Sequence, residues 1–176
     1  MLKKLVLPLM IGSALMASDI SMEITNNTLA GNVNLNIPQN ENFQIRGTYL
    51  YNDHTDRHNY YSVGFAAIGQ TPIDNYNSQI SIFVDFDHTK DNTAIPIGIS
   101  LFNNNIGTFQ YPLFAKAEVA YAPAILSFDD AYRELKTKVE IGIKPIENAK
   151  AFIGYKSVSF NQNYISVGYA GIGFVF

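Results

Sequence analysis

Residues 53–58, with the sequence DHTDRH, form the most polar short segment of the chain. Its two histidines, His54 and His58, and its two aspartates have the side chains that bind divalent metals such as zinc. The segment also falls in a predicted loop facing water, where polar residues are common without any such role. We therefore predict no metal site and no cofactor.

A second group of candidate chemical residues lies near the same end of the predicted strands. Asp85, Asp87 and His88 end one strand, and Asp129 and Asp130 lie in a neighbouring loop. Carboxylates and an imidazole at a barrel rim could activate water or a serine, as in a hydrolase. The chain has neither a Gly-x-Ser-x-Gly elbow nor a His-Glu-x-x-His helix. We predict that the protein is not an enzyme, with a hydrolase acting at the rim as the alternative.

The composition narrows the class of protein. Hydrophobic residues make up 47% of the chain and charged residues only 15%, which is unusual for a surface that meets water everywhere. No internal run approaches the roughly 18 apolar residues of a membrane helix. The absence of cysteine excludes disulfides and thiolate metal ligands, and a net charge of -3 gives no reason to expect nucleic acid.

The N-terminus has the pattern of a secretory signal peptide. Lys3 and Lys4 precede an apolar run that ends at Ala17, and polar Ser18 and Asp19 follow. We expect residues 1–17 to be removed after export and residues 18–176 to form one domain.

From Asp19 onward, hydrophobicity alternates with a period of two, which is typical of β-strands. Residues 132–144 show it best, because their even positions carry mainly Glu and Lys while most odd positions are apolar. Ten segments share the pattern: residues 20–25, 32–37, 43–52, 61–67, 79–87, 95–101, 116–121, 132–144, 150–156 and 164–176. Residues 26–27, 53–59, 88–94, 122–131 and 157–163 are then outward loops. The pattern predicts an up-and-down antiparallel β-barrel of about ten strands, with eight as the fallback.

Alternation alone does not decide which face of the strands points outward. A soluble periplasmic ligand-binding barrel would have its apolar face inside, and a membrane barrel would have it outside. A Lys or Arg on a lipid-facing strand costs about 2–4 kcal/mol at the bilayer midplane, so in a membrane barrel the charges must line the lumen. We predict an interior lattice of ion pairs with a largely plugged lumen, formed mainly by Lys116, Glu118, Glu134, Lys136, Lys138, Glu140 and Lys144. Near-equal numbers of acids and bases, including Glu23, Asp85, Asp87, Arg46, Lys150 and Lys156, share this face.

The C-terminus ends in a strand with aromatic residues. Gly171, Phe174 and the terminal Phe176 resemble the signal that hands outer-membrane proteins to the barrel-assembly machinery, although Tyr169 stands where a more polar residue is usual. Phe174 and Phe176 share one strand face and suit the aromatic girdle at the inner membrane interface.

Several short segments resemble the YfaZ family of outer-membrane proteins. They are residues 117–123, 126–127, 132–134 and 154–156, with residues 51–54 and 61–65 fitting that family's third and fourth strands. The resemblance implies an outer-membrane barrel of uncertain biochemical role and supplies no catalytic residues. The expectation is therefore an integral outer-membrane β-barrel, structural or a narrow pore, whose partners are outer-membrane lipid and the assembly machinery.

Overall fold

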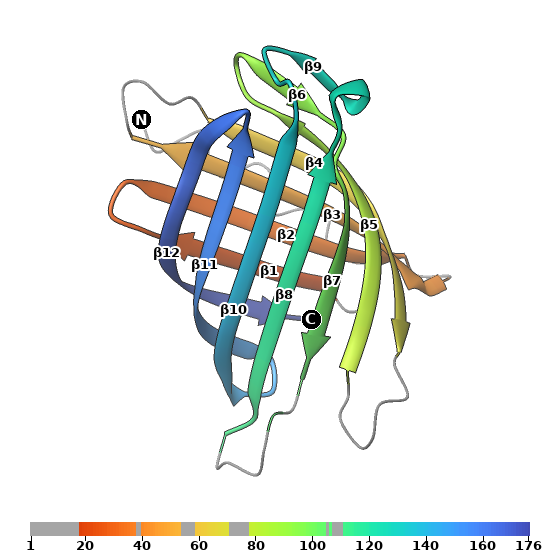
Figure 1. Ribbon diagram of the computed structural model, residues 1–176. Coiled ribbons are helices and arrows are strands. Elements are labelled where there is room, and N and C mark those ends of the chain that lie inside the picture. The colour runs from red at the N-terminus through yellow and green to blue at the C-terminus, as the bar shows by residue number, and fades with distance from the viewer. Residues whose placement is uncertain (1–17, 38–39, 54–58, 71–77, 105, 107–110) are drawn as a thin grey trace, which may run out of the picture.

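The computed structural model describes residues 18–37, 40–53, 59–70, 78–104, 106 and 111–176, and Figure 1 shows them as a barrel. Ten antiparallel strands form the wall: β1 (Ser18–Ile24), β2 (Thr28–Ile37), β3 (Asn40–Asn52), β4 (Tyr60–Gln70), β5 (Ser78–His88), β7 (Ile97–Asn103), β8 (Leu113–Ala122), β10 (Glu134–Ile146), β11 (Ala149–Phe160) and β12 (Gln162–Val175). Each strand pairs with the next along the chain, and β1 pairs with β12 to close the ring. The prediction of a ten-stranded up-and-down barrel is confirmed. None of the described helices has the length and apolar character to span a membrane.

Two of the predicted outward loops contain further structure. Strand β6 (Asn92–Ala94) pairs with β5 and also with β9 (Ser127–Asp129), which follows the 3-10 turn η2 (Ala124–Leu126). These pieces stand together at the upper end of the barrel (Figure 1). The alternation pattern did not reveal them because each strand has only three residues.

The predicted loop at residues 157–163 is wrong. Strand β11 runs to Phe160 and β12 starts at Gln162, so that Asn161 alone forms the turn. Asn161 has a φ of 57°, a left-handed conformation that asparagine tolerates better than most residues. A single asparagine thus replaces the expected loop.

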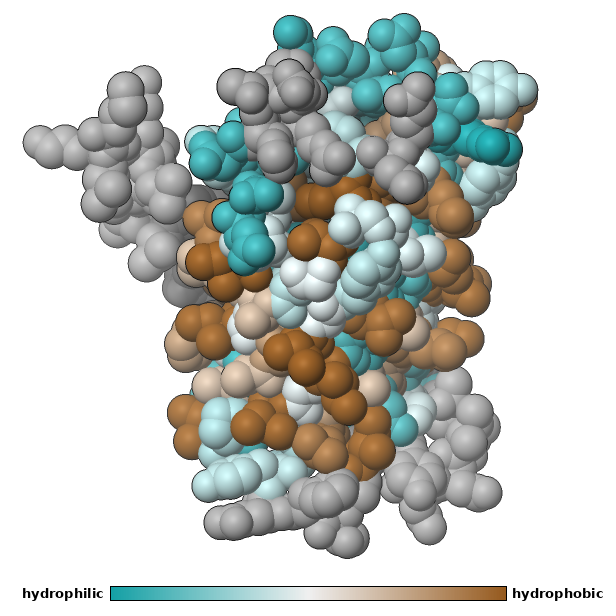
Figure 2. Space-filling model, turned by 60° about the vertical axis from the view of Figure 1, so that its left-hand side comes forward, coloured by the Kyte–Doolittle hydropathy of each residue, from teal (hydrophilic) through white to brown (hydrophobic). Residues whose placement is uncertain are grey.

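The outward face of the wall is apolar and the inward face is polar. Phe65, Ile153 and Ile172 keep 63%, 62% and 58% of their surface exposed, whereas Glu23, Asp85 and Glu140 are buried. Figure 2 shows the hydrophobic residues, in brown, gathered across the middle and lower part of one face of the molecule, with hydrophilic residues above them. The period-two pattern therefore places ionic side chains inside and apolar side chains outside.

Small inward residues make room for aromatic rings on neighbouring strands. Phe83 breaks the apolar–polar alternation of its strand, and the structure shows why: it points inward, 1% exposed, and packs over Gly98. Phe114 lies in the same way against Gly142. Ring and glycine together keep the interior close-packed without pushing the strands apart.

A side chain at Gly98 should therefore destabilise the barrel. A Cβ there would lie 2.6 Å from both the Ala120 Cβ and the Val119 carbonyl oxygen. We expect Gly98→Ala to lower the free energy of unfolding by about 1–3 kcal/mol, the usual cost of overpacking. Gly31→Ala is the control, because nothing lies within 4 Å of a Cβ there. Urea unfolding in lipid vesicles, followed by tyrosine fluorescence, measures both; equal midpoints would contradict the packing argument.

Candidate functional site: the ion-paired interior

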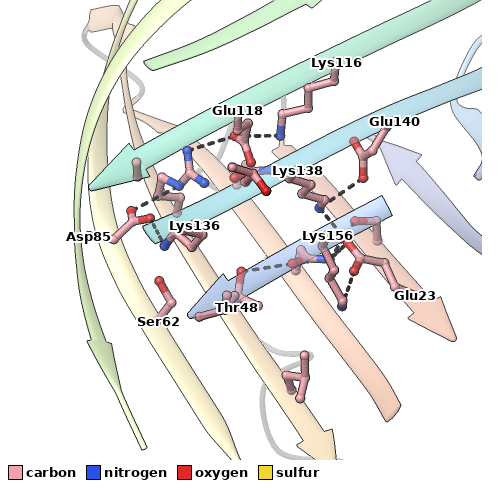
Figure 3. Close-up of a pocket in the computed structure, with 18 of the residues that line it drawn as sticks. Glu23, Thr48, Ser62, Asp85, Lys116, Glu118, Lys136, Lys138, Glu140 and Lys156 are labelled. Atoms are coloured by element: carbon pink, nitrogen blue, oxygen red, sulfur yellow. Dashed lines mark hydrogen bonds and ion pairs between the residues drawn. The ribbon is translucent and has the colours of Figure 1, made fainter. Parts of the chain in front are cut away.

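One connected network of ion pairs crosses the barrel interior, and Figure 3 shows most of its members. The Lys136 Nζ lies 2.7 Å from the Asp85 Oδ2 and 2.6 Å from the Asp87 Oδ2. The Arg46 Nε lies 3.2 Å from the other oxygen of Asp85, and its Nη1 lies 3.2 Å from Glu118. Lys116 is the last member of the network, and its Nζ lies 3.1 Å from the same Glu118 oxygen. Four strands (β3, β5, β8 and β10) contribute, so the network ties opposite parts of the wall together.

A second network is centred on Glu23 of β1. Its two carboxylate oxygens accept hydrogen bonds from Lys138 at 2.6 Å and from Lys156 at 2.7 Å. The Asn32 side-chain amide donates to the Lys138-facing oxygen at 2.7 Å. Lys138 also pairs with Glu140 at 3.0 Å, and the Tyr169 hydroxyl donates to that carboxylate at 2.9 Å. Every charge here has an opposite charge in contact, as enclosed ions require.

Rings and the remaining space complete the middle of the interior. The guanidinium of Arg46 lies over the Phe83 ring, 4.0 Å from its centroid. Two recesses of about 80 and 140 Å³ lie beside the networks, and both reach Arg46, Lys116 and Glu118. About 10–15 Å³ of such volume suffices for one water, so both recesses have room for small groups of water molecules. Ion pairs, rings and these two recesses thus share the middle of the interior in the described part.

Both ends of the interior are packed with apolar side chains. At the upper end, Ala94 of β6, Leu126 of η2 and Ala131 after β9 pack against Phe160 and other barrel residues, and we call this group the apolar cap. At the lower end, an aromatic row runs along the wall, made of Phe102, Phe114, Phe152 and Tyr169. In the described part, the apolar cap thus lies at the end of the barrel where β6, η2 and β9 stand, and the aromatic row lies toward the other end.

The predicted lattice residues fall into three groups. Lys116, Glu118, Lys136, Lys138 and Glu140 lie in the two networks. Lys144 does not, since it lies near the lower end and donates to the side chain of Asn104. Glu134 is fully buried, but neither of its carboxylate oxygens has a hydrogen-bond partner.

Sequence reasoning missed the neutral partners of these ions. Tyr169 was considered only as part of the C-terminal pattern, yet it is 5% exposed and bonds to Glu140. Tyr60 likewise accepts a hydrogen bond from Lys136 at 3.3 Å. The inward parity of Tyr169, which it shares with Gly171, was the available signal.

The rim residues considered for hydrolysis fall into separate hydrogen-bonded groups: Asp85 and Asp87 bind Lys136, and His88 contacts Thr93. His88 Nδ1 lies 2.9 Å from the Thr93 hydroxyl, which donates to Asp129 at 2.8 Å. Because the hydroxyl proton is directed to Asp129, His88 faces the hydroxyl oxygen as a donor and not as the base that would take its proton. Within the described residues, no group of three or more acidic, histidine or cysteine side chains could hold a metal. Residues 54–58 lie outside the described part, and Asp53 beside them is exposed.

The structure describes the C-terminal residues of the predicted assembly signal but not the predicted signal peptide. Phe174 and Phe176 point outward at the lower end, 50% and 66% exposed, and Gly171 faces inward against the Phe152 ring. Strand β1 starts beside the end of β12, as the pairing of Asp19 with Val175 shows. The predicted signal peptide, residues 1–17, lies outside the described residues.

Solved structures share the fold, whereas no family model and no curated protein sequence matches the chain. The structure of the KdgM porin aligns with a TM-score of 0.53 and 10% identity, covering 92% of this chain and 99% of that one. A second structure, the KdgM porin in complex with disordered oligogalacturonate, aligns with a TM-score of 0.49 and 10% identity over the same shares. At this identity the likeness concerns the fold, and it agrees with the closed ten-stranded barrel.

Removing Glu23 should disrupt the second network. Glu23→Ala leaves Lys138 with Glu140 only and Lys156 with no ion pair among the described residues. We expect a loss of about 3–5 kcal/mol, as for breaking a buried ion pair. The double variant Glu23→Gln/Lys156→Met should lose less than the sum of its single changes, and Glu147→Gln on the exposed lower turn should lose little. Strictly additive losses in urea unfolding would mean that the two residues do not interact.

Proposed function

We propose that the protein is an integral outer-membrane β-barrel. The observation that carries the proposal is an apolar outer surface (Figure 2) around an ion-paired interior (Figure 3). In water, this arrangement would expose large apolar side chains on every wall strand and enclose the charges, the reverse of a soluble barrel. In a bilayer, the same belt meets hydrocarbon and the charges are kept from it.

The dimensions of the wall support the proposal. Eight of the ten wall strands have 10 to 14 residues, and a tilted strand needs about 9–11 residues to cross the hydrocarbon core. The closed ring also leaves no whole strand edge unpaired, since β1 and β12 join. The fold shared with the KdgM porin is consistent with this location.

Location and assembly are parts of the same proposal. The predicted signal peptide would export the chain, and Gly171, Phe174 and Phe176 would be the signal read by the barrel-assembly machinery. Because both termini of the barrel lie at its lower end, that end would face the periplasm and β6, η2 and β9 would face outward. Within this class, membership of the YfaZ family remains a prediction from short resemblances.

We further propose that the barrel is a narrow pore in a closed state, not an enzyme. The apolar cap, the two ion-pair networks and recesses of only about 80 and 140 Å³ support a closed interior. At the rim, the Thr93 hydroxyl directs its proton to Asp129, so His88 is not the base of a Ser/Thr–His pair there, which favours a pore over a hydrolase.

Neighbouring residues on β10 test the orientation of the wall. The chain has no cysteine, so Val139→Cys and Glu140→Cys each supply one site for a fluorescent label. Val139 is 56% exposed outward and Glu140 is 6% exposed inward. In lipid vesicles, we expect quenchers attached to acyl chains to quench the label at position 139 and not the one at 140. The opposite pattern, or a folded monomer in plain buffer, would contradict the membrane proposal.

Bilayer recordings test the closed pore. We expect the native protein to pass little steady current. Because Ala122 and Glu134 are paired, a two-residue Asn-Gly turn can replace residues 123–133 and remove η2 and β9. This variant should conduct several-fold more, whereas Ile125→Ser, a change at an 82% exposed residue, should not. Large, steady currents through the native protein would show that the interior is not closed.

A further inference from the structure

Two buried carboxyl groups lie where the upper loops join the wall. We call residues 89–96 and 123–133, which include β6, η2 and β9, the lid. Asp87 lies near the end of β5 and pairs with Ala94 of the first lid loop. Glu134 begins β10 directly after the second lid loop. The two carboxyl groups therefore stand at the two places from which the lid extends.

The two lid loops are held together by backbone hydrogen bonds. The Ile95 amide donates to the Leu126 carbonyl at 2.8 Å, and the Asp130 amide donates to the Asp91 carbonyl at 3.1 Å. Strand β6 also pairs with β9 through Ala94 and Ser127. Separating the two points of attachment would break these bonds between the loops.

Glu134 and Asp87 have complementary unsatisfied atoms. Both residues are 0% exposed. Neither oxygen of Glu134 has a hydrogen-bond partner, and nor has the Asp87 Oδ1, whereas the Asp87 Oδ2 binds Lys136. Glu134 stands two residues before Lys136 on the same inward face of β10, and the Lys136 Nζ lies 2.6 Å from Asp87, so the two carboxyl groups are neighbours that interact electrostatically. Two adjacent buried carboxylates would be costly, and a single hydrogen between them would give one oxygen of each group a partner.

The charge count leaves Glu134 as the surplus acid. The upper network balances Asp85, Asp87 and Glu118 against Lys136, Arg46 and Lys116. The second network balances Glu23 and Glu140 against Lys138 and Lys156. Every base in these networks therefore already has its acid.

Among the described groups around Glu134, none carries a positive charge that is not already paired, and the Tyr60 hydroxyl interacts with Asp87. Asp87 and Asp85 face it from β5 and Tyr60 from β4, while Lys136 on its own strand is held by both aspartates. Its strand partners, Ala122 on β8 and Phe160 on β11, are uncharged. An ionised Glu134 would thus add a negative charge beside two others, under an apolar cap.

We propose that Glu134 and Asp87 share one proton, donated from the Glu134 carboxyl to the Asp87 Oδ1, and that this proton latches the lid closed. Loss of the proton to solvent leaves two adjacent carboxylates, which repel each other and separate the two lid loops. The barrel then opens toward its upper end as pH rises. The latch deepens the proposed closed pore by naming what closes it, and its test does not require a current.

Amide hydrogen exchange in lipid nanodiscs tests the latch. The probes are the amides of Ile95 and Asp130, whose bonds join the two loops. If opening releases one proton, their protection, corrected for the intrinsic exchange rate, should fall about tenfold per pH unit within the range of about pH 6 to 9. Glu134→Gln, which keeps the shape and a hydrogen-bond donor, should remove this slope, and Glu147→Gln should keep it.

Two results would overturn the latch: a flat native profile, or the same slope in Glu134→Gln. If Glu134→Gln does not refold, Asp87→Asn serves in its place, because it removes the accepting carboxylate and should also flatten the profile. The outcome is separable from the pore proposal. If the protection falls with pH but the current does not rise at high pH, the latch is supported and the pore proposal is contradicted. If the protection falls with pH and the native protein already conducts steadily, the latch is supported and the closed state is contradicted.

Discussion

The closed ladder of backbone hydrogen bonds is the constraint on which the rest of the structure depends. In a hydrocarbon surrounding, a strand finds no partner for its N–H and C=O groups except another strand, so the sheet must return to its first strand. The pairing of β1 with β12 achieves this closure. Once the ring is closed, alternate side chains must point into a space of fixed width. That is why the ionic face is confined and must satisfy itself.

The interior meets this requirement by pairing ions and by filling space. Glu23 forms ion pairs with two lysines on different strands, and Lys136 forms ion pairs with two aspartates of β5. Rings occupy what the ion pairs leave, as where Phe83 lies between Arg46 and Gly98. Ion pairs between distant strands also fix the ring's cross-section, because each contact sets the separation of two wall segments. Interior ion pairs therefore stabilise the barrel in addition to the backbone hydrogen bonds between its strands.

The upper end combines two kinds of closure. Apolar residues such as Ala94 and Phe160 pack together at this end, an interaction that is not directional and does not depend on a proton. Beneath them, the carboxyl groups of Glu134 and Asp87 lie where the lid joins the wall, and their mutual interaction depends on a proton. Apolar packing alone would not respond to pH, whereas the proposed proton shared by the two carboxyl groups gives the proposed pore a way to open as pH rises.

The sequence alone determined the local periodicity, because strand alternation is a property of neighbouring residues. It gave the ten wall strands and the ionic character of one face, with Lys136, Lys138 and Glu140 on it. It did not reveal β6 and β9, which are too short to show a period, or the turn at Asn161. Tertiary structure alone decided which charges meet, since Glu23 and Lys138 are 115 residues apart and are joined by barrel closure. It also separated Lys144 at the lower end and Glu134 from the paired ions, because their position along the axis, not their residue type, determines which groups they reach.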